Sequence, residues 1–119
     1  MKLVLAEAGH EELREELARW EGYVSSALLA VESVRACARY GDGWVDDARA
    51  WLDGVALLPL DGAVVAAATE LGPAPLRSLD ALHLATALSI RDDVGAFVVY
   101  DERLAAAAAE RGLPVAAPA

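Results

Sequence analysis

The chain has 119 residues, of which 56% are hydrophobic, and 19 acidic against 10 basic side chains give it a formal net charge of −9. This length and hydrophobic content predict one folded domain over residues 1–119 and exclude an intrinsically disordered chain. The acidic surface predicts weak non-specific binding to nucleic acid, although a bound metal ion could still recruit a phosphate group locally.

Cysteine content and hydropathy predict a cytoplasmic protein that does not enter a membrane. Cys37 is the single cysteine, so no disulfide can form within the chain. No stretch reaches the roughly 20 apolar residues of a membrane-spanning helix. Acidic residues also arrive early, at Glu7, Glu11 and Glu12, which is unlike a secretory signal peptide.

Apolar periodicity and helix-breaking residues divide the chain into alternating helices and strands. The first half is predicted to hold a short helical stretch, a helix, a strand and two further helices, at residues 1–8, 11–20, 23–25, 26–40 and 44–52. Ser26 and Asp61 are predicted to cap the helices that follow them. The second half is predicted to alternate strand and helix, at residues 55–60, 61–71, 78–90, 96–100, 104–111 and 115–116.

Continuously apolar strands between helices predict an α/β fold with a parallel sheet buried on both faces. In such folds the ligand site lies beyond the carboxyl ends of the strands. Asp101 directly follows the strand predicted at 96–100. Glu32 and Asp80 lie near the starts of predicted helices, so all three side chains can reach the same edge of the sheet.

Glu32, Asp80 and Asp101 stand in apolar surroundings, where a charge is costly to bury. Asp80 and Asp101 could be ordinary helix caps or first-turn acids. Glu32 lies past the first turn of its helix, and it could instead pair with Arg35. If the three acids converge, their mutual repulsion requires a divalent cation, which indicates metal-dependent hydrolysis.

His83 lies three residues after Asp80, on the same face of the predicted helix. The pair could bind a metal ion, or His83 could be a core histidine that hydrogen-bonds a neighbour. The chain has no glycine-rich phosphate loop, no Cys/His zinc spacing and no nucleophile elbow. These absences exclude P-loop enzymes, kinases, zinc proteases and serine hydrolases.

Three segments resemble the PIN-domain ribonucleases, and within them the VapC-type toxins of bacterial toxin–antitoxin pairs. They are SSALLAVE at residues 25–32, LDALHLATA at 79–87 and VYDERLAAA at 99–107. The resemblance covers the chain from about Lys2 onward, and the middle segment is the most specific. It implies a parallel sheet between helices and Mg²⁺- or Mn²⁺-dependent cleavage of RNA, with Glu32, Asp80 and Asp101 as catalytic, metal-binding residues.

The resemblance also implies a departure at the N-terminus. Such proteins begin with a central apolar strand that ends in an Asp, the first metal ligand, followed by a short helix. Residues 1–7 look like the end of that helix. On this interpretation the first strand and its acid are missing from an N-terminally truncated domain, the native start lies upstream, and the 119-residue form is weak or inactive.

The partners that the resemblance implies are an RNA substrate, a cognate antitoxin that blocks the site and a second copy in a homodimer. An Arg-bearing antitoxin segment would suit the acidic residues. Two alternatives remain. One is a catalytically inactive PIN-fold module that dimerises or binds the antitoxin. The other is a small α/β domain in which the acids are only caps.

Overall fold

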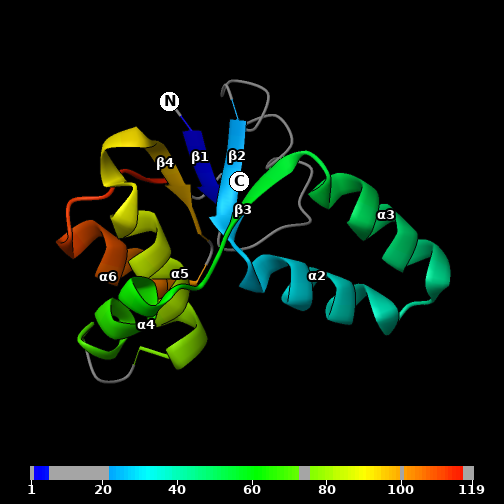
Figure 1. The fold of residues 1–119 in the computed structure, drawn as a ribbon, viewed down its shortest axis with the longest axis horizontal. Helices are drawn as coiled ribbons and strands as arrows, with labels where there is room; N and C mark the ends of the chain where they lie inside the picture. The colour runs from blue at the N-terminus through cyan, green and yellow to red at the C-terminus, as the bar shows by residue number, and fades with distance from the viewer. Residues whose placement is uncertain (1, 6–21, 73–75, 100, 117–119) are drawn as a thin grey trace.

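The structure is a computed structural model and describes residues 2–5, 22–72, 76–99 and 101–116. Within these ranges, one five-stranded sheet runs through the molecule (Figure 1). Its order is β3 (Val55–Leu58), β2 (Gly22–Ser26), β1 (Lys2–Leu5), β4 (Val94–Val98) and β5 (Val115–Ala116). Every neighbouring pair of strands is parallel. The predicted α/β class with a parallel sheet is therefore confirmed.

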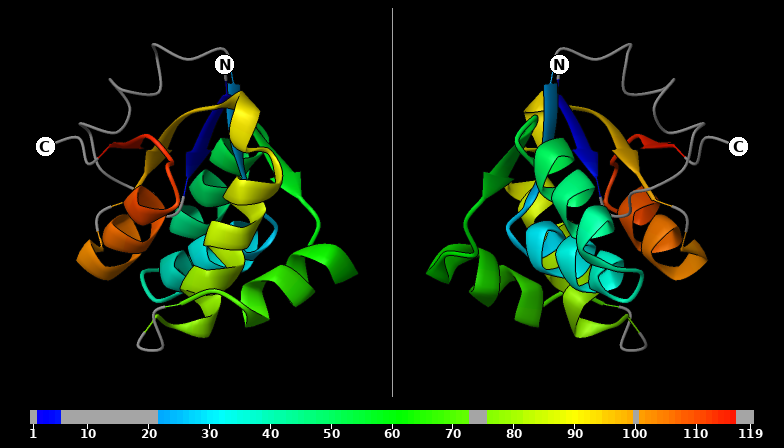
Figure 2. Two further views of the ribbon diagram at one scale, coloured as in Figure 1. Left: turned by 90° about the vertical axis from the view of Figure 1, so that its left-hand side faces the viewer. Right: turned by 90° about the vertical axis from the view of Figure 1, so that its right-hand side faces the viewer.

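Helices cover both faces of the sheet. They are α2 (Leu28–Ala38), α3 (Asp42–Leu52), α4 (Gly62–Thr69), α5 (Ser78–Ser89) and α6 (Glu102–Glu110), with a short 3-10 helix η1 (Arg91–Asp93) before β4. The two views of Figure 2 show α4, α5 and α6 toward one side of the molecule and the α2–α3 pair toward the other. None of the helices in the described ranges is long and apolar enough to cross a membrane.

Side chains of β4 alternate between two buried clusters, as the pleat of a strand requires. Phe97 packs with Leu84 of α5 and Leu104 of α6, and all three are at most 1% exposed. Val98 points the other way and packs with Leu29 of α2. The sheet is thus buried on both faces, which explains why its strands are continuously apolar in sequence.

The N-terminal segment differs from the prediction. Residues 1–8 are predicted to be helical, but Lys2–Leu5 forms strand β1. The resemblance to PIN-domain proteins predicts that the central strand is missing, but β1 fills the sheet centre between β2 and β4, so this prediction is wrong. Without β1, backbone groups of both neighbours would lack partners. A four-residue apolar run carries no periodicity that separates strand from helix. The helix predicted at 11–20 lies outside the described residues.

Most other predicted elements are confirmed, with ends shifted by a few residues. Asp61 caps α4 as predicted, because its Oδ1 accepts a hydrogen bond from the Val64 N–H at 2.9 Å. The predicted Ser26 cap is wrong. Ser26 ends β2, α2 begins after Ala27 without a side-chain cap, and the Ser26 hydroxyl contacts His83 instead.

Candidate active site

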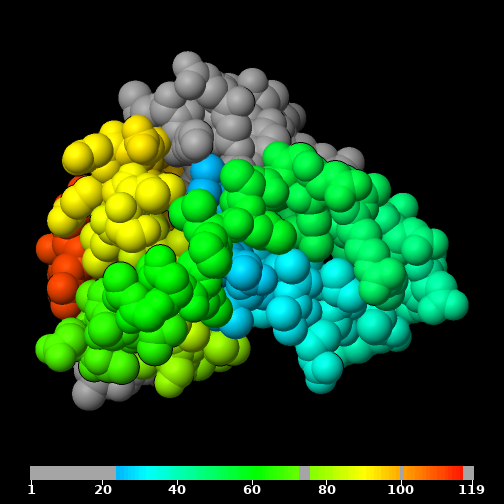
Figure 3. Space-filling view, viewed as in Figure 1, coloured from blue at the N-terminus to red at the C-terminus, as the bar shows by residue number. Residues whose placement is uncertain are grey.

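The three acids predicted from the sequence come from three helices. Glu32 lies on α2, which Figure 1 shows projecting with α3 away from the other helices. Asp80 is in the first turn of α5, and Asp101 is the N-cap of α6, shortly after β4 ends. Figure 3 shows a recess between α2 and the N-terminal part of α5 on the face seen there. The helix starts therefore bring acidic residues toward one region, as the parallel topology predicts.

Asp101 uses its two carboxylate oxygens differently. Oδ1 accepts a hydrogen bond from the Leu104 N–H at 2.9 Å, which confirms that Asp101 caps α6. Oδ2 lies 3.5 Å from Nη2 of Arg77. A capping role therefore does not exclude a second role, because the cap occupies one oxygen and orients the other.

Asp80 shares the same arginine. Its Oδ2 lies 3.9 Å from Nε of Arg77, so the guanidinium stands between the carboxylates of Asp80 and Asp101. The two acids are about one-quarter exposed, at 23% and 25%, whereas the Arg77 side chain is 72% exposed. The structure thus gathers two of the predicted acids around one positive charge.

The pKa of Asp80 is affected by the other two acids, Asp101 and Glu32. Burial raises the pKa of Asp80 above its ordinary value of 3.8, and the neighbouring Asp101 raises it further. Arg77 and His83 act in the opposite direction, and Glu32 adds a last upward contribution. All three predicted acids are therefore close enough to affect one ionisation.

Glu32 is held by His83. Its Oε1 lies 2.5 Å from Nε2 of the imidazole, and Nδ1 of the same ring lies 2.9 Å from the Ser26 hydroxyl. The His83 side chain is 3% exposed and Glu32 is 41% exposed. Both contacts are satisfied when Nε2–H donates to Glu32 and Nδ1 shares a hydrogen bond with the Ser26 hydroxyl. His83 is therefore the buried, hydrogen-bonded histidine that the sequence left as one alternative.

The site consists of two connected groups, Asp80–Arg77–Asp101 and Glu32–His83–Ser26, joined by Asp80 and His83 on α5. Over the described ranges, no group of three or more His, Cys, Asp or Glu side chains is arranged to hold a metal ion. Sequence reasoning missed Arg77 and Ser26. A basic residue three positions before Asp80 was the available signal for Arg77.

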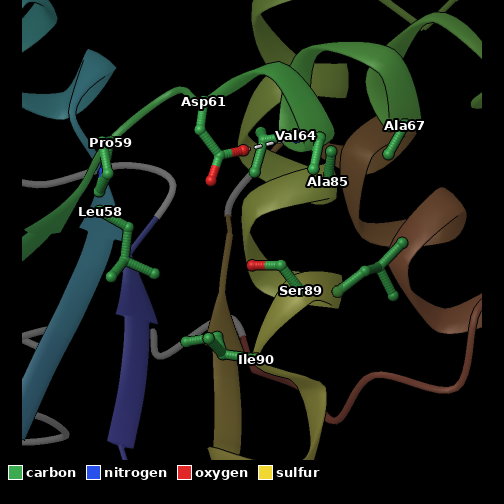
Figure 4. Close-up of a pocket in the computed structure, with 10 residues that line it drawn as sticks. Leu58, Pro59, Asp61, Val64, Ala67, Ala85, Ser89 and Ile90 are labelled. Atoms are coloured by element: carbon green, nitrogen blue, oxygen red, sulfur yellow. Dashed lines mark hydrogen bonds between the residues drawn. The ribbon is translucent and has the colours of Figure 1, made fainter.

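An apolar pocket of about 380 Å³ lies elsewhere, between the β3–α4 junction and α5 (Figure 4). Leu58, Val64 and Ile90 are among its lining residues. Asp61 also lines it, but one oxygen of this carboxylate caps α4, as the dashed line in Figure 4 shows. None of the three candidate acids lines this pocket, so it is separate from the candidate site.

Comparison with known proteins agrees with this architecture. The chain matches the PIN domain family over residues 1–110. It is 43% identical over 122 residues to "Ribonuclease VapC47" of Mycobacterium tuberculosis (strain CDC 1551 / Oshkosh), covering 98% of this chain and 90% of that protein. It is 38% identical over 118 residues to "Ribonuclease VapC46" of Mycobacterium tuberculosis (strain ATCC 25618 / H37Rv), covering 99% of this chain and 91% of that protein. The chain therefore belongs to the PIN-domain family, together with these VapC relatives.

Proposed function

We propose that this protein is a metal-dependent endoribonuclease toxin of the VapC type, which hydrolyses phosphodiester bonds in RNA. Its relatives are named ribonucleases and align along nearly the whole chain. The single observation that carries the proposal is the pair of carboxylates, Asp80 and Asp101, gathered around one cationic group. Such a pair is suited to a cation that binds RNA phosphate.

The chemistry of these donor atoms suits Mg²⁺ or Mn²⁺. Both ions prefer oxygen ligands, and carboxylates are the usual protein source. Burial and Asp101 raise the pKa of Asp80, so a nearby cation would make its charged form more favourable. We propose that Asp80, Asp101 and Glu32 hold the ion. A bound divalent ion supplies charge stabilisation for the phosphate and lowers the pKa of water.

The chain's own residues position the acids. His83 is nearly fully buried, and the Ser26 hydroxyl at 2.9 Å fixes its ring. The ring in turn holds Glu32, whose carboxylate is partly exposed and can face a ligand. The cap of α6 orients Asp101 in the same way. These contacts prepare the acids before RNA binds, so less ordering is needed at the moment of reaction.

The proposal includes partners. We propose a cognate antitoxin that neutralises the enzyme, and the net charge of −9 favours a basic, Arg-bearing segment in it. We also propose that residues 1–119 form a single domain that assembles as a homodimer in the cytoplasm.

Cleavage of RNA by the purified protein tests this function. We expect cleavage that requires Mg²⁺ or Mn²⁺ and stops when the metal is chelated. The cleavage rate should fall at least about 100-fold in Asp80→Asn, because the neutral amide of Asn binds a divalent cation more weakly than a carboxylate does. Asp47→Asn is the matched control, since Asp47 is exposed and lies on α3, which carries none of the candidate acids. Equal activity of wild type and Asp80→Asn would contradict the proposal.

One observation favours a second candidate, a catalytically inactive PIN-fold module that dimerises or binds the antitoxin. Within the described ranges the acids do not form a three-residue metal cluster, and a protein cation stands between two of them. Mn²⁺ binding without any RNA cleavage, in a protein that still binds its antitoxin, would favour this candidate over the enzyme.

A further inference from the structure

Arg77 has a fixed backbone and an exposed head group. Its carbonyl oxygen accepts the Ala81 N–H at 2.8 Å and so anchors the first turn of α5. Its side chain nevertheless remains 72% exposed. The guanidinium can therefore leave its two carboxylates without disturbing the helix that carries Asp80.

The two contacts of the guanidinium are weak individually. The distances are 3.9 Å to Asp80 and 3.5 Å to Asp101, and both are longer than an ordinary hydrogen bond. Exposed ion pairs of this kind contribute little to stability. A divalent ion at the same carboxylates carries twice the charge, and the oxygens that contact Arg77 are suitable ligands for it.

From these observations we propose that Arg77 is an internal counter-ion that competes with the divalent metal for Asp80 and Asp101. This inference rests on the proposed function. In the metal-free protein, Arg77 offsets the repulsion between the two acids. When the ion binds, the guanidinium must move away, and metal affinity is reduced by the contacts that it gives up. Arg77 thereby sets the metal concentration at which the site fills.

If Arg77 competes with the metal, Arg77→Gln should bind Mn²⁺ more tightly but be less stable without metal. Arg77→Gln removes the competing charge, so we expect Mn²⁺ to bind about threefold to tenfold more tightly, the range for one exposed ion pair and one nearby positive charge. The same variant leaves the two acids without a counter-ion, so its metal-free melting temperature falls slightly. A merely structural arginine would lower stability without tightening metal binding.

The experiment is a calorimetric titration of the full chain with Mn²⁺ alone, paired with thermal melts in chelator. Arg49→Gln is the matched control, because Arg49 is exposed on α3 and its loss changes the net charge equally. Arg77→Lys keeps the charge but not the planar fork, so its Mn²⁺ affinity should lie between those of Arg77→Gln and wild type.

The outcomes separate the competition from the proposed function. Unchanged or weaker Mn²⁺ binding in Arg77→Gln, or equal tightening in Arg49→Gln, would overturn the competition. If wild type still binds Mn²⁺ and Asp80→Asn does not, the proposed metal site survives that result. Binding by Arg77→Gln but not by wild type would support the competition strongly. Absence of binding in both proteins would overturn the competition and the metal site together.

Discussion

At Asp80, burial, repulsion and attraction act on one side chain. Burial and Asp101 raise its pKa more than Arg77 and His83 lower it. The folded state therefore binds the Asp80 proton more tightly than the unfolded state. By linkage, this stabilisation is fully present below the unfolded pKa of 3.8 and is lost as pH rises through the raised folded pKa. At neutral pH, ionised Asp80 therefore opposes folding even beside Arg77, unless a further cation compensates it.

Asp80→Asn should therefore stabilise the metal-free protein at pH 7. The melting temperature in chelator should rise by roughly 1–3 °C, because the charge is partly exposed and its effect is small. The gain should shrink as pH falls below 3.8, where the wild-type carboxyl is protonated in both states. Thermal melts between pH 3 and 8 measure the rise in melting temperature at pH 7 and its decrease at low pH, with Asp47→Asn as the control for net charge. A lower melting temperature for Asp80→Asn at pH 7 would contradict this account.

Sequence could identify single acids but not their partners. Glu32, Asp80 and Asp101 were recognisable because acids are rare in apolar segments. Arg77 was not, because an exposed arginine before a helix has many ordinary roles. Ser26 was predicted as a cap, and its contact with His83 spans 57 positions in the chain. A contact between residues so far apart in the chain depends on how β2 and α5 pack, and the sequence near either residue does not reveal that packing.

Helix α5 is the element that organises the site. It carries both Asp80 and His83, and its buried face packs against the sheet. The Ser26 hydroxyl at the end of β2 contacts Nδ1 of His83, and Glu32 of α2 contacts Nε2. The imidazole thus links one strand and two helices. We expect this link to fix the position of α5 relative to β2.

A double-mutant cycle tests that link. Ser26→Ala and His83→Leu each leave a buried polar partner unsatisfied, and each should reduce the free energy of unfolding by about 1–3 kcal/mol. The double variant should lose less than the sum, with a coupling energy of roughly 0.5–3 kcal/mol in chemical denaturation. Thr69→Ala combined with His83→Leu is the control, because the Thr69 hydroxyl bonds within its own helix. Simple additivity of the Ser26 and His83 changes would refute the link.

Element types were largely predictable because strands and helices have different apolar periods. The strands at Val55–Leu58 and Val94–Val98 and the cap of α4 by Asp61 follow from such local signals. Strand β1 could not be predicted in this way, since a run of four residues fits the apolar period of a helix as well as that of a strand. Its place between β2 and β4 depends on pairing with strands more than 15 residues away in sequence.

For the whole molecule, the parallel sheet explains why acids distant in sequence meet. Two apolar clusters bury its faces, and Phe97 and Val98 of β4 contribute to opposite ones. The helix starts then lie beyond the carboxyl ends of the strands, where Asp80 and Asp101 share Arg77. A net charge of −9 disfavours RNA binding over most of the surface, so the proposed RNA cleavage requires a site that holds a cation.

The most direct test of the central claim is a crystal structure of the protein grown with Mn²⁺, with the ion located by its anomalous scattering. We predict a peak in direct contact with carboxylate oxygens of Asp80 and Asp101, Glu32 facing the same ion, and the Arg77 guanidinium moved away from it. Density for the ion at a different place, or Asp80 and Asp101 still paired with Arg77 at saturating Mn²⁺, would contradict the claim.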